Sequence, residues 1–571
     1  MNCTKYTKNL SVTACFIFIL FTGCKHSFDE HAYYKITKRV NNVKAGVVSA
    51  HPLATAVGID ILNKGGNAVD AAIAVQFALA VVYPNAGNIG GGGFFLYRDK
   101  NGNTAALDFR EKAPARAFTE MYLDSLGNPI TDASLYGAKA AGVPGTVDGM
   151  VKIFEKYSQR KDWALLLSPA IELASKGFPI TAREAENLNK KAAYFKRNND
   201  HVTSFQKDRW QAGDILVQKD LAATLKAIQE KGRAGFYEGG VAEKIVKSMK
   251  NNDGIISLQD LQDYQSVWRN PLSGNYRGYT VHTMPPPSSG GIALLQLLEM
   301  IEPYPVDQMK FQSPEHVHLF TEAERRVYAD RAKHLGDPDF YQVPVKELLD
   351  SSYIVHRMST FNPRQKTPSD SISFGLIEKE ETTHFSIVDA EGNAVSVTTT
   401  LNGSFGSFQV VSGAGFLLNN EMDDFSVKPG HPNLYGLIGY EANKIEPGKR
   451  MLSSMTPTIV EKNGNLFMVV GTPGGSTIIT SVFQVVSNVI DFKMNISEAV
   501  QSFRFHHQWK PDCIYYESKF DTATAIVLQS LGHTLTPREP IGRVEAILVN
   551  DEGKLFLAAD PRGDDDAKGI Q

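Results

Sequence analysis

Two runs of β-branched residues, 382–389 and 393–400, flank the turn sequence DAEGN at 389–393. Threonine, valine and isoleucine favour extended backbone, and Asp, Gly and Asn favour tight turns, so the pattern predicts a β-hairpin. A three-residue loop pairs residues whose numbers sum to 782, and a two-residue loop makes the sum 783. Thr382 then faces Thr400 in the first case and the next residue in the second.

This hairpin places a threonine where it can become a nucleophile. A threonine hydroxyl needs a base beside it, and the nearest one is the α-amino group of the same residue. That group is an amide until the peptide bond between Glu381 and Thr382 is cut. The hydroxyl of Thr400 could then hold the amine or the hydroxyl of Thr382. The simpler interpretation is that 398–400 is only a strand of high β-propensity.

The stretch resembles the processing site and small-subunit start of the γ-glutamyltranspeptidase family. The resemblance covers nearly the whole chain after the first forty residues, and its motifs are specific only when taken together. They are GGGGF (90–94), LDFRE (107–111), AGVPGT (141–146), PPPSSGG (285–291), TTHFSIVDAEGNAVSVTTTLN (382–402), GAGFLLNNEMDDFS (413–426), RMLSSMTP (450–457), GTPGGS (471–476), FRFHHQW (503–509) and DPR (560–562).

The resemblance implies the α+β fold of the N-terminal nucleophile hydrolases, a four-layer α/β/β/α sandwich. It implies a proenzyme that cuts itself into a large subunit, 24–381, and a small subunit, 382–571, which stay together as a heterodimer. It implies no metal and no organic cofactor. The run Gly90–Gly93 lacks the Gly-Lys-Ser/Thr ending of a phosphate loop, so we interpret it as close backbone packing near the active site.

Catalytic roles follow from the same resemblance. Thr382 would be the nucleophile, with Thr400 beside it, and Gly474 and Gly475 would form the oxyanion hole. The residues themselves allow this role for the glycines, because they join a predicted strand to a predicted helix, 477–490. Bare N–H groups at a helix start can bind a developing oxyanion, although a simple strand-to-helix turn explains the pair equally well.

The resemblance also implies substrate-binding roles for a second group of residues. An arginine flanked by acids, as Arg110 is, usually makes a structural ion pair. By resemblance it clamps the substrate α-carboxylate, because a guanidinium fork suits a carboxylate. The other implied contacts are Ser453 and Ser454 to this carboxylate, Asn402, Glu421 and Asp424 to the α-amino group, and Tyr435 as a lid. Some relatives carry glutamine in place of Glu421, so we expect a more negative pocket here.

The implied reaction is acyl transfer from glutathione or another γ-glutamyl compound to water, an amino acid or a peptide. A close alternative is an acylase of the same fold with another acyl preference, such as a cephalosporin acylase or a poly-γ-glutamate hydrolase. A distant alternative is a non-catalytic substrate-binding lipoprotein that stays uncut. A denaturing gel tests the distant alternative, because an uncut lipoprotein gives one band and a self-cleaved enzyme gives two.

The charge and the histidine positions bear on two kinds of partner, nucleic acids and metal ions. The formal net charge of −3 and the lack of a polybasic run argue against nucleic-acid binding. His282 and the pair His506-His507 have no acidic or cysteine partner at ligand spacing, so we expect no metal.

The N-terminus has the pattern of an export signal. Lys5 and Lys8 precede an apolar run, 12–21, that is too short to span a bilayer comfortably. A small residue before Cys24 resembles a bacterial lipoprotein signal, with 1–23 removed and Cys24 lipidated, although Phe21 departs from the usual leucine. We therefore expect an exported protein, periplasmic or anchored to the outer membrane. The remaining cysteine of the body, Cys513, is expected to be buried and structural.

Replacing the lipidated cysteine tests the anchor. Cys24→Ala should release the protein from the membrane fraction, because a protein without its acyl chains has lost its hydrophobic attachment. Cys15→Ala, in the same leader, is the matched control and should stay with the membrane. Membrane association of Cys24→Ala at the wild-type level would exclude lipidation as the anchor.

Overall fold

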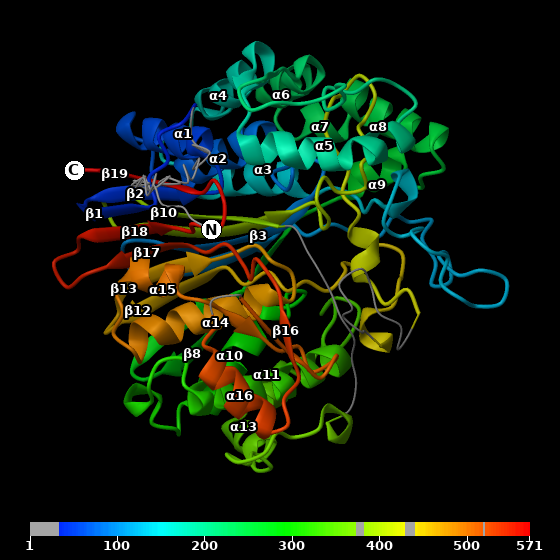
Figure 1. The fold of residues 1–571 in the computed structure, drawn as a ribbon. Coiled ribbons are helices and arrows are strands. Elements are labelled where there is room, and N and C mark those ends of the chain that lie inside the picture. Colours follow the sequence, from blue (N-terminus) through cyan, green and yellow to red (C-terminus); the bar gives the residue numbers. More distant parts are fainter. Residues whose placement is uncertain (1–32, 373–381, 429–439, 518–519) are drawn as a thin grey trace, which may run out of the picture.

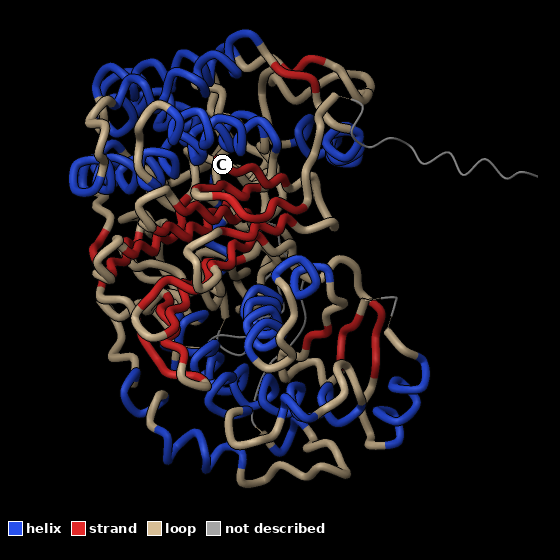
Figure 2. Tube along the Cα trace, turned by 90° about the vertical axis from the view of Figure 1, so that its left-hand side faces the viewer, coloured by secondary structure: helices blue, strands red, loops and turns tan. Residues whose placement is uncertain are grey.

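The computed structural model describes residues 33–372, 382–428, 440–517 and 520–571. Within these ranges the chain forms two seven-stranded antiparallel sheets stacked between two layers of helices (Figure 1). Figure 2 shows the same order from the side, with helices outside and strands in the middle. The expected α/β/β/α sandwich is confirmed.

The first sheet holds the predicted hairpin at its centre. Strand β10 (Thr383–Val388) pairs with β11 (Ala394–Thr400) on one side and with β2 (Ala45–Ser49) on the other. In spatial order the strands are β19 (Asp566–Ile570), β2 (Ala45–Ser49), β10 (Thr383–Val388), β11 (Ala394–Thr400), β3 (Gly92–Arg98), β4 (Thr104–Asp108) and β7 (Val267–Arg269).

The second sheet lies below the first in Figure 1. Its order is β1 (Arg39–Val43), β18 (Leu555–Ala559), β17 (Glu545–Val549), β13 (Asn465–Gly471), β12 (Thr458–Lys462), β9 (Tyr279–Thr283) and β8 (Leu272–Tyr276). Short strands lie outside both sheets, namely β5 (Phe178–Pro179), β6 (Ile215–Leu216), β14 (Phe505–His506), β15 (Ile514–Tyr516) and β16 (Leu535–Pro537).

Helices cover the outer face of each sheet. Those on the first sheet are α1 (Pro52–Asn63), α2 (Ala68–Val82), α3 (Thr146–Tyr157), α4 (Trp163–Lys176), α5 (Ala182–Arg197), α6 (Lys219–Lys231), α7 (Ala234–Tyr237), α8 (Gly239–Asn251) and α9 (Leu258–Asp263). Those on the second are α10 (Gly290–Ile301), α11 (Pro314–His334), α12 (Val345–Leu348), α13 (Ser351–Met358), α14 (Thr477–Ile490), α15 (Ile496–Gln501) and α16 (Thr522–Ser530).

Strand alternation sorts the side chains of β10 between two cores. Phe385 and Ile387 pack against the helices of the first layer, and Val388 packs between the sheets. His384 and Ser386 also face the second sheet, because the Ser386 hydroxyl donates to the carbonyl of Glu545 in β17 (3.0 Å). Successive strand residues point to opposite faces, which explains this division.

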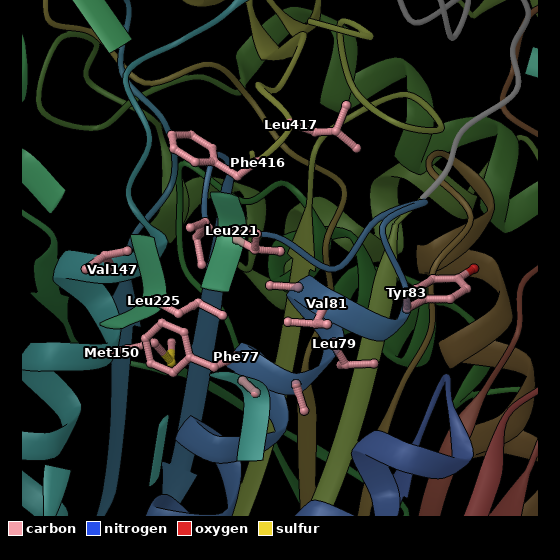
Figure 3. Close-up of a cluster of buried hydrophobic side chains, with 14 of the residues drawn as sticks. Phe77, Leu79, Val81, Tyr83, Val147, Met150, Leu221, Leu225, Phe416 and Leu417 are labelled. Carbon is pink, nitrogen blue, oxygen red and sulfur yellow. The ribbon is translucent and has the colours of Figure 1, made fainter. Parts of the chain in front are cut away.

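Helix α2 lies buried between the first sheet and the other helices of its layer. Asn67 caps it, because its side chain accepts from the backbone N–H of Asp70 (2.9 Å) while the Asp70 carboxylate accepts from that of Asn67 (3.0 Å). Every residue of α2 is buried, and Figure 3 shows Phe77 and Val81 in the apolar cluster with Met150 and Leu225.

In the part of the chain that the structure describes, no helix is long and apolar enough to cross a membrane.

Candidate active site

The hairpin register decides which residue faces Thr382. Thr383 pairs with Thr399, and Asp389 N donates to Asn393 O (3.1 Å), so the loop has three residues and the paired numbers sum to 782. Continuing this register by one residue puts Thr382 opposite Thr400. Thr382 is buried, with 2% of its surface exposed. The alternative register is excluded.

The glycine run packs directly against the end of β11, as the sequence predicts. Gly92 pairs with Thr400 and Gly93 with Thr399. A methyl group on Gly91 would lie 2.1 Å from the carbonyl oxygen of Thr400, which is closer than atoms can approach. Only glycine allows this contact, so the run fixes the backbone beside the proposed nucleophile.

A neutral histidine supports the strand below Thr382. His384 Nδ1 lies 2.9 Å from Thr398 Oγ1, and its Nε2 lies 3.1 Å from Ser386 Oγ. Complete burial lowers the pKa of His384 to about 3. Ser386 donates its proton to Glu545, so Nε2–H donates to Ser386 and Nδ1 accepts from Thr398. The sequence motif contains His384, but no pattern indicated this role.

Gly474 and Gly475 lie in the loop between β13 and α14. Their φ angles are 130° and 57°, both in the region that favours glycine. The carbonyl of Gly474 accepts from the backbone N–H of Thr477 (3.0 Å), which starts the helix. Within the described residues neither glycine N–H donates a hydrogen bond, so both donors can serve an oxyanion.

Arg110 lies at the centre of a buried ionic cluster. Among the described residues three carboxyl groups surround its guanidinium, those of Glu421 (2.6 Å), Asp424 and Glu111 (3.5 Å). Its Nη2 also donates to the carbonyl of Leu452 (3.2 Å). The cluster has one carboxyl group more than the sequence analysis expected, because Glu111 joins Glu421 and Asp424.

The cluster shifts the pKa of its members. Burial alone would lower the pKa of Arg110, but the carboxylates of Glu421 and Asp424 hold it above its usual value. Burial raises the pKa of Asp424, against the opposing effect of Arg110. Burial raises the pKa of Glu111 to about 8, so this carboxyl is uncharged at neutral pH.

A second arginine, Arg331 of α11, lies near the same cluster. Arg331 Nη2 donates to Ser454 Oγ (3.0 Å), and its Nε donates to Ser289 Oγ (2.9 Å). Its charge also opposes the rise that burial causes in the pKa of Asp424. No sequence pattern indicated Arg331, which is one of several arginines in a long helix.

Of the remaining predicted residues, some lie within the part of the chain that the structure describes and some lie outside it. Asn402 lies next to Thr400, whose hydroxyl accepts from the Asn402 backbone N–H (2.7 Å), and the Asn402 amide donates to Asn420 O (3.0 Å). Ser453 Oγ accepts from Met455 N (3.1 Å). The other predictions lie outside the described residues, namely Glu381, Tyr435 and Cys24.

One group of side chains in the described part of the chain has the spacing of metal ligands, namely His318, Glu322 and His533. The Glu322 carboxylate is paired with Arg325 (3.1 Å) and Arg326 (2.7 Å). His318 Nδ1 and His533 Nε2 lie 2.7 Å apart, which is a hydrogen bond. Because the protein already uses these atoms, we assign no metal to them.

The raised pKa of Glu111 predicts a pH dependence of stability. In the unfolded chain this carboxyl ionises near pH 4.3, but in the folded protein it ionises near pH 8. Between these values the folded state binds a proton that the unfolded state has lost, so stability falls as pH rises through this window. Glu111→Gln, which mimics the neutral carboxyl, should flatten the decline of Tm between pH 5 and 8. The exposed Glu120→Gln is the control, and equal slopes in both variants would contradict the assignment.

Comparison with known proteins agrees with this geometry. Residues 54–570 match the family model described as Gamma-glutamyltranspeptidase. The glutathione hydrolase proenzyme of Escherichia coli (strain K12) is 45% identical over 526 residues, covering 91% of this chain and 90% of that protein. The protein of the same name from Pseudomonas aeruginosa is 48% identical over 514 residues, which cover 89% of this chain and 91% of that protein.

A solved structure has the same fold. The cephalosporin acylase from Bacillus halodurans superposes with a TM-score of 0.81 at 26% identity, over 95% of this chain and 98% of that one. The family match over most of the chain, the identity to full-length relatives and the paired threonines lead to one conclusion. The chain belongs to the γ-glutamyltranspeptidase family.

Proposed function

We propose that this protein is a self-processing γ-glutamyl hydrolase and transferase that cleaves glutathione and related γ-glutamyl amides. The observation that carries the proposal is that the Arg110 cluster and the strand before Gly474 both lie against the strands that hold Thr382. A methyl group on Gly92, which pairs with Thr400, would lie 2.6 Å from Glu111 Oε2, and one on Gly471, three residues before Gly474, would lie 2.2 Å from the ring of His384. The glutathione hydrolases that the chain resembles at 45% and 48% identity support the choice of substrate.

The reaction begins after the bond between Glu381 and Thr382 is broken. The Thr382 amine takes the proton of its own hydroxyl, and Oγ attacks the γ-amide carbon of the substrate. The N–H groups of Gly474 and Gly475 receive the charge on the tetrahedral oxygen. The C–N bond then breaks, the leaving amine takes the proton, and a γ-glutamyl ester on Thr382 remains. Water or an acceptor amine resolves this ester.

The head-group pocket suits a free α-amino acid. With Glu111 uncharged, the two arginines and the two remaining carboxylates give a balanced pocket that matches a zwitterion. The substrate α-carboxylate lies against Arg110 and the hydroxyls of Ser453 and Ser454, and its α-ammonium lies against Glu421 and Asp424. This selection of a free amino-acid head favours the γ-glutamyl reaction over that of an acylase with another acyl preference.

The sheets explain why two pieces would remain one protein. In the first sheet β10 of the small piece lies between β2 of the large piece and β11 of the small piece, and β3 of the large piece follows. The second sheet also mixes strands of both pieces, since β12 pairs with β9. Separating the pieces would break both sheets, so we propose a stable heterodimer of 24–381 and 382–571.

Export remains part of the proposal. The basic leader, the short apolar run and Cys24 support a lipid anchor in the periplasm or on the outer membrane. Tyr435 is proposed as a residue over the substrate, on the resemblance alone.

Self-cleavage gives the first test. The small fragment should begin Thr-Thr-His-Phe-Ser, and Thr382→Ala should give a folded, uncut and inactive chain, because both steps use the same hydroxyl. N-terminal sequencing and a denaturing gel measure this. Thr383→Ala is the neighbouring control and should still be cut, and a fragment that begins at Thr383 would reject Thr382 as the nucleophile.

The head-group pocket gives the second test. Arg110→Ala and Asp424→Ala should each lower kcat/KM for γ-glutamyl-p-nitroanilide by roughly 30- to 3,000-fold, because each leaves a substrate charge unpaired in a buried site. The exposed Arg116→Ala is the matched control for loss of an arginine. Wild-type activity in cut Arg110 and Asp424 variants would favour an acylase with a different substrate.

A further inference from the structure

Two buried asparagines hold the glycine run from opposite sides. Asn88 precedes the run in the large piece and has 3% of its surface exposed, and Asn419 of the small piece is fully buried. The Asn88 Oδ1 accepts from the backbone N–H of Gly91 (3.1 Å), and the Asn419 Nδ2 donates to the carbonyl of Gly90 (2.9 Å). Both asparagines lie outside the set of residues assigned to catalysis and substrate binding.

Asn88 fastens the end of β11. Its Nδ2 donates to the carbonyl of Thr400 (2.9 Å) and to the hydroxyl of Thr399 (3.0 Å). Its Oδ1 also accepts from the hydroxyl of Thr146 (2.7 Å), at the start of α3. Because the Gly91 N–H can only donate and the Thr400 carbonyl can only accept, the amide has one possible orientation. The backbone of Thr400 is therefore held by a side chain that is itself fixed.

Asn419 fastens the carboxylate side of the site in the same way. Its Oδ1 accepts from the backbone N–H groups of Gly142 (2.9 Å) and Glu421 (3.0 Å). Its Nδ2 donates to the carbonyls of Gly90 and Gly142, both at 2.9 Å. These four bonds use both hydrogens and both acceptor sites of the amide. Glu421, whose carboxylate lies 2.6 Å from the guanidinium of Arg110, is thus tied to Gly90 through one side chain.

The two asparagines meet at one short, closely packed piece of backbone. Gly90 and Gly91 are adjacent, and the Gly91 carbonyl accepts from the backbone N–H groups of Gly145 (2.8 Å) and Thr146 (3.1 Å). A methyl group on Gly90 would lie 2.1 Å from the carbonyl oxygen of Leu417. Packing this close leaves the run no room to shift, so it is a fixed reference for both parts of the site.

We propose that Asn88 and Asn419 are separate positioning residues for the two halves of the site. Asn88 places Thr400, which faces Thr382. Asn419 places Glu421 in the head-group pocket. Self-cleavage and acyl transfer depend on the first half, and binding of a free α-amino acid head depends on the second. This inference rests on the proposed function and adds two residues to it.

Asn88→Asp tests the nucleophile half. The substitution keeps the shape of the side chain but turns a carboxylate oxygen toward the carbonyl of Thr400, which repels it. Self-cleavage should slow, and kcat for γ-glutamyl-p-nitroanilide per cut molecule should fall, each by roughly 10- to 100-fold, because small displacements of reacting groups have effects of this size. The inhibition constant of L-glutamate, which has the head group but no scissile amide, should stay at the wild-type value.

Asn419→Asp tests the head-group half and should give the opposite result. Its carboxylate would face the carbonyls of Gly90 and Gly142, so the backbone that carries Glu421 would move. The inhibition constant of L-glutamate should rise about fivefold or more, because charge-assisted hydrogen bonds depend on geometry. Self-cleavage should proceed at the wild-type rate, because that step involves no head group.

A buried asparagine of α14 provides the matched control. The Asn488 amide donates to the carbonyl of Ala499 in α15 (3.4 Å), and Asn488→Asp should leave the self-cleavage rate, kcat and the inhibition constant unchanged. If either Asp variant is insoluble, Asn88→Ser and Asn419→Ser remove the same amide bonds without adding a charge and should show the same division.

The division between the two variants decides the assignment, because a loss of general stability would change both measurements together. Equal effects of the Asn88 and Asn419 variants on self-cleavage and on L-glutamate inhibition, or no effect of either, would overturn it. A wild-type protein that is cut but releases no p-nitroaniline would instead remove the proposed function, while the self-cleavage rates would still test Asn88.

Discussion

The hydrogen-bonded pairing of β10 with β2 and β11 is the constraint on which the site depends. It holds the start of β10, and therefore Thr382, between strands that belong to both sides of the proposed cut. On the other side of β11, the glycines of β3 pair with Thr399 and Thr400. A chain cut before Thr382 would keep all of these bonds, so cleavage would free an amine without loosening the backbone around it.

Burial determines the chemistry of the head-group pocket. Arg110 is almost fully buried, and a buried charge is stable only when it is paired. Its carboxyl partners come from Glu111 next to it in sequence and from Glu421 and Asp424 more than three hundred residues away. The pocket therefore exists only when the two parts of the chain are folded together, and a zwitterionic head group can take over these pairings.

Much of the fold followed from local pattern. The strand β13 and the helix α14 lie where the sequence predicts them, because each has its own hydrophobic period. Arg331 was missed because its partners Ser289 and Ser454 are distant in sequence. His384 was missed because its neutral state depends on complete burial, which the local sequence does not reveal. Glu111 was overlooked as a pocket member although it stands beside Arg110.

The sequence by itself determined the hairpin, the family and the identity of the residues proposed for catalysis, because these depend on short motifs and residue chemistry. It left the hairpin register open, since the turn DAEGN permits two loop lengths. Only the tertiary structure decided that Thr382 faces Thr400, because pairing with β2 and β3 and burial of Phe385 and Ile387 allow one register. The charge balance around Arg110 was likewise decided by packing, since burial is a property of the whole fold.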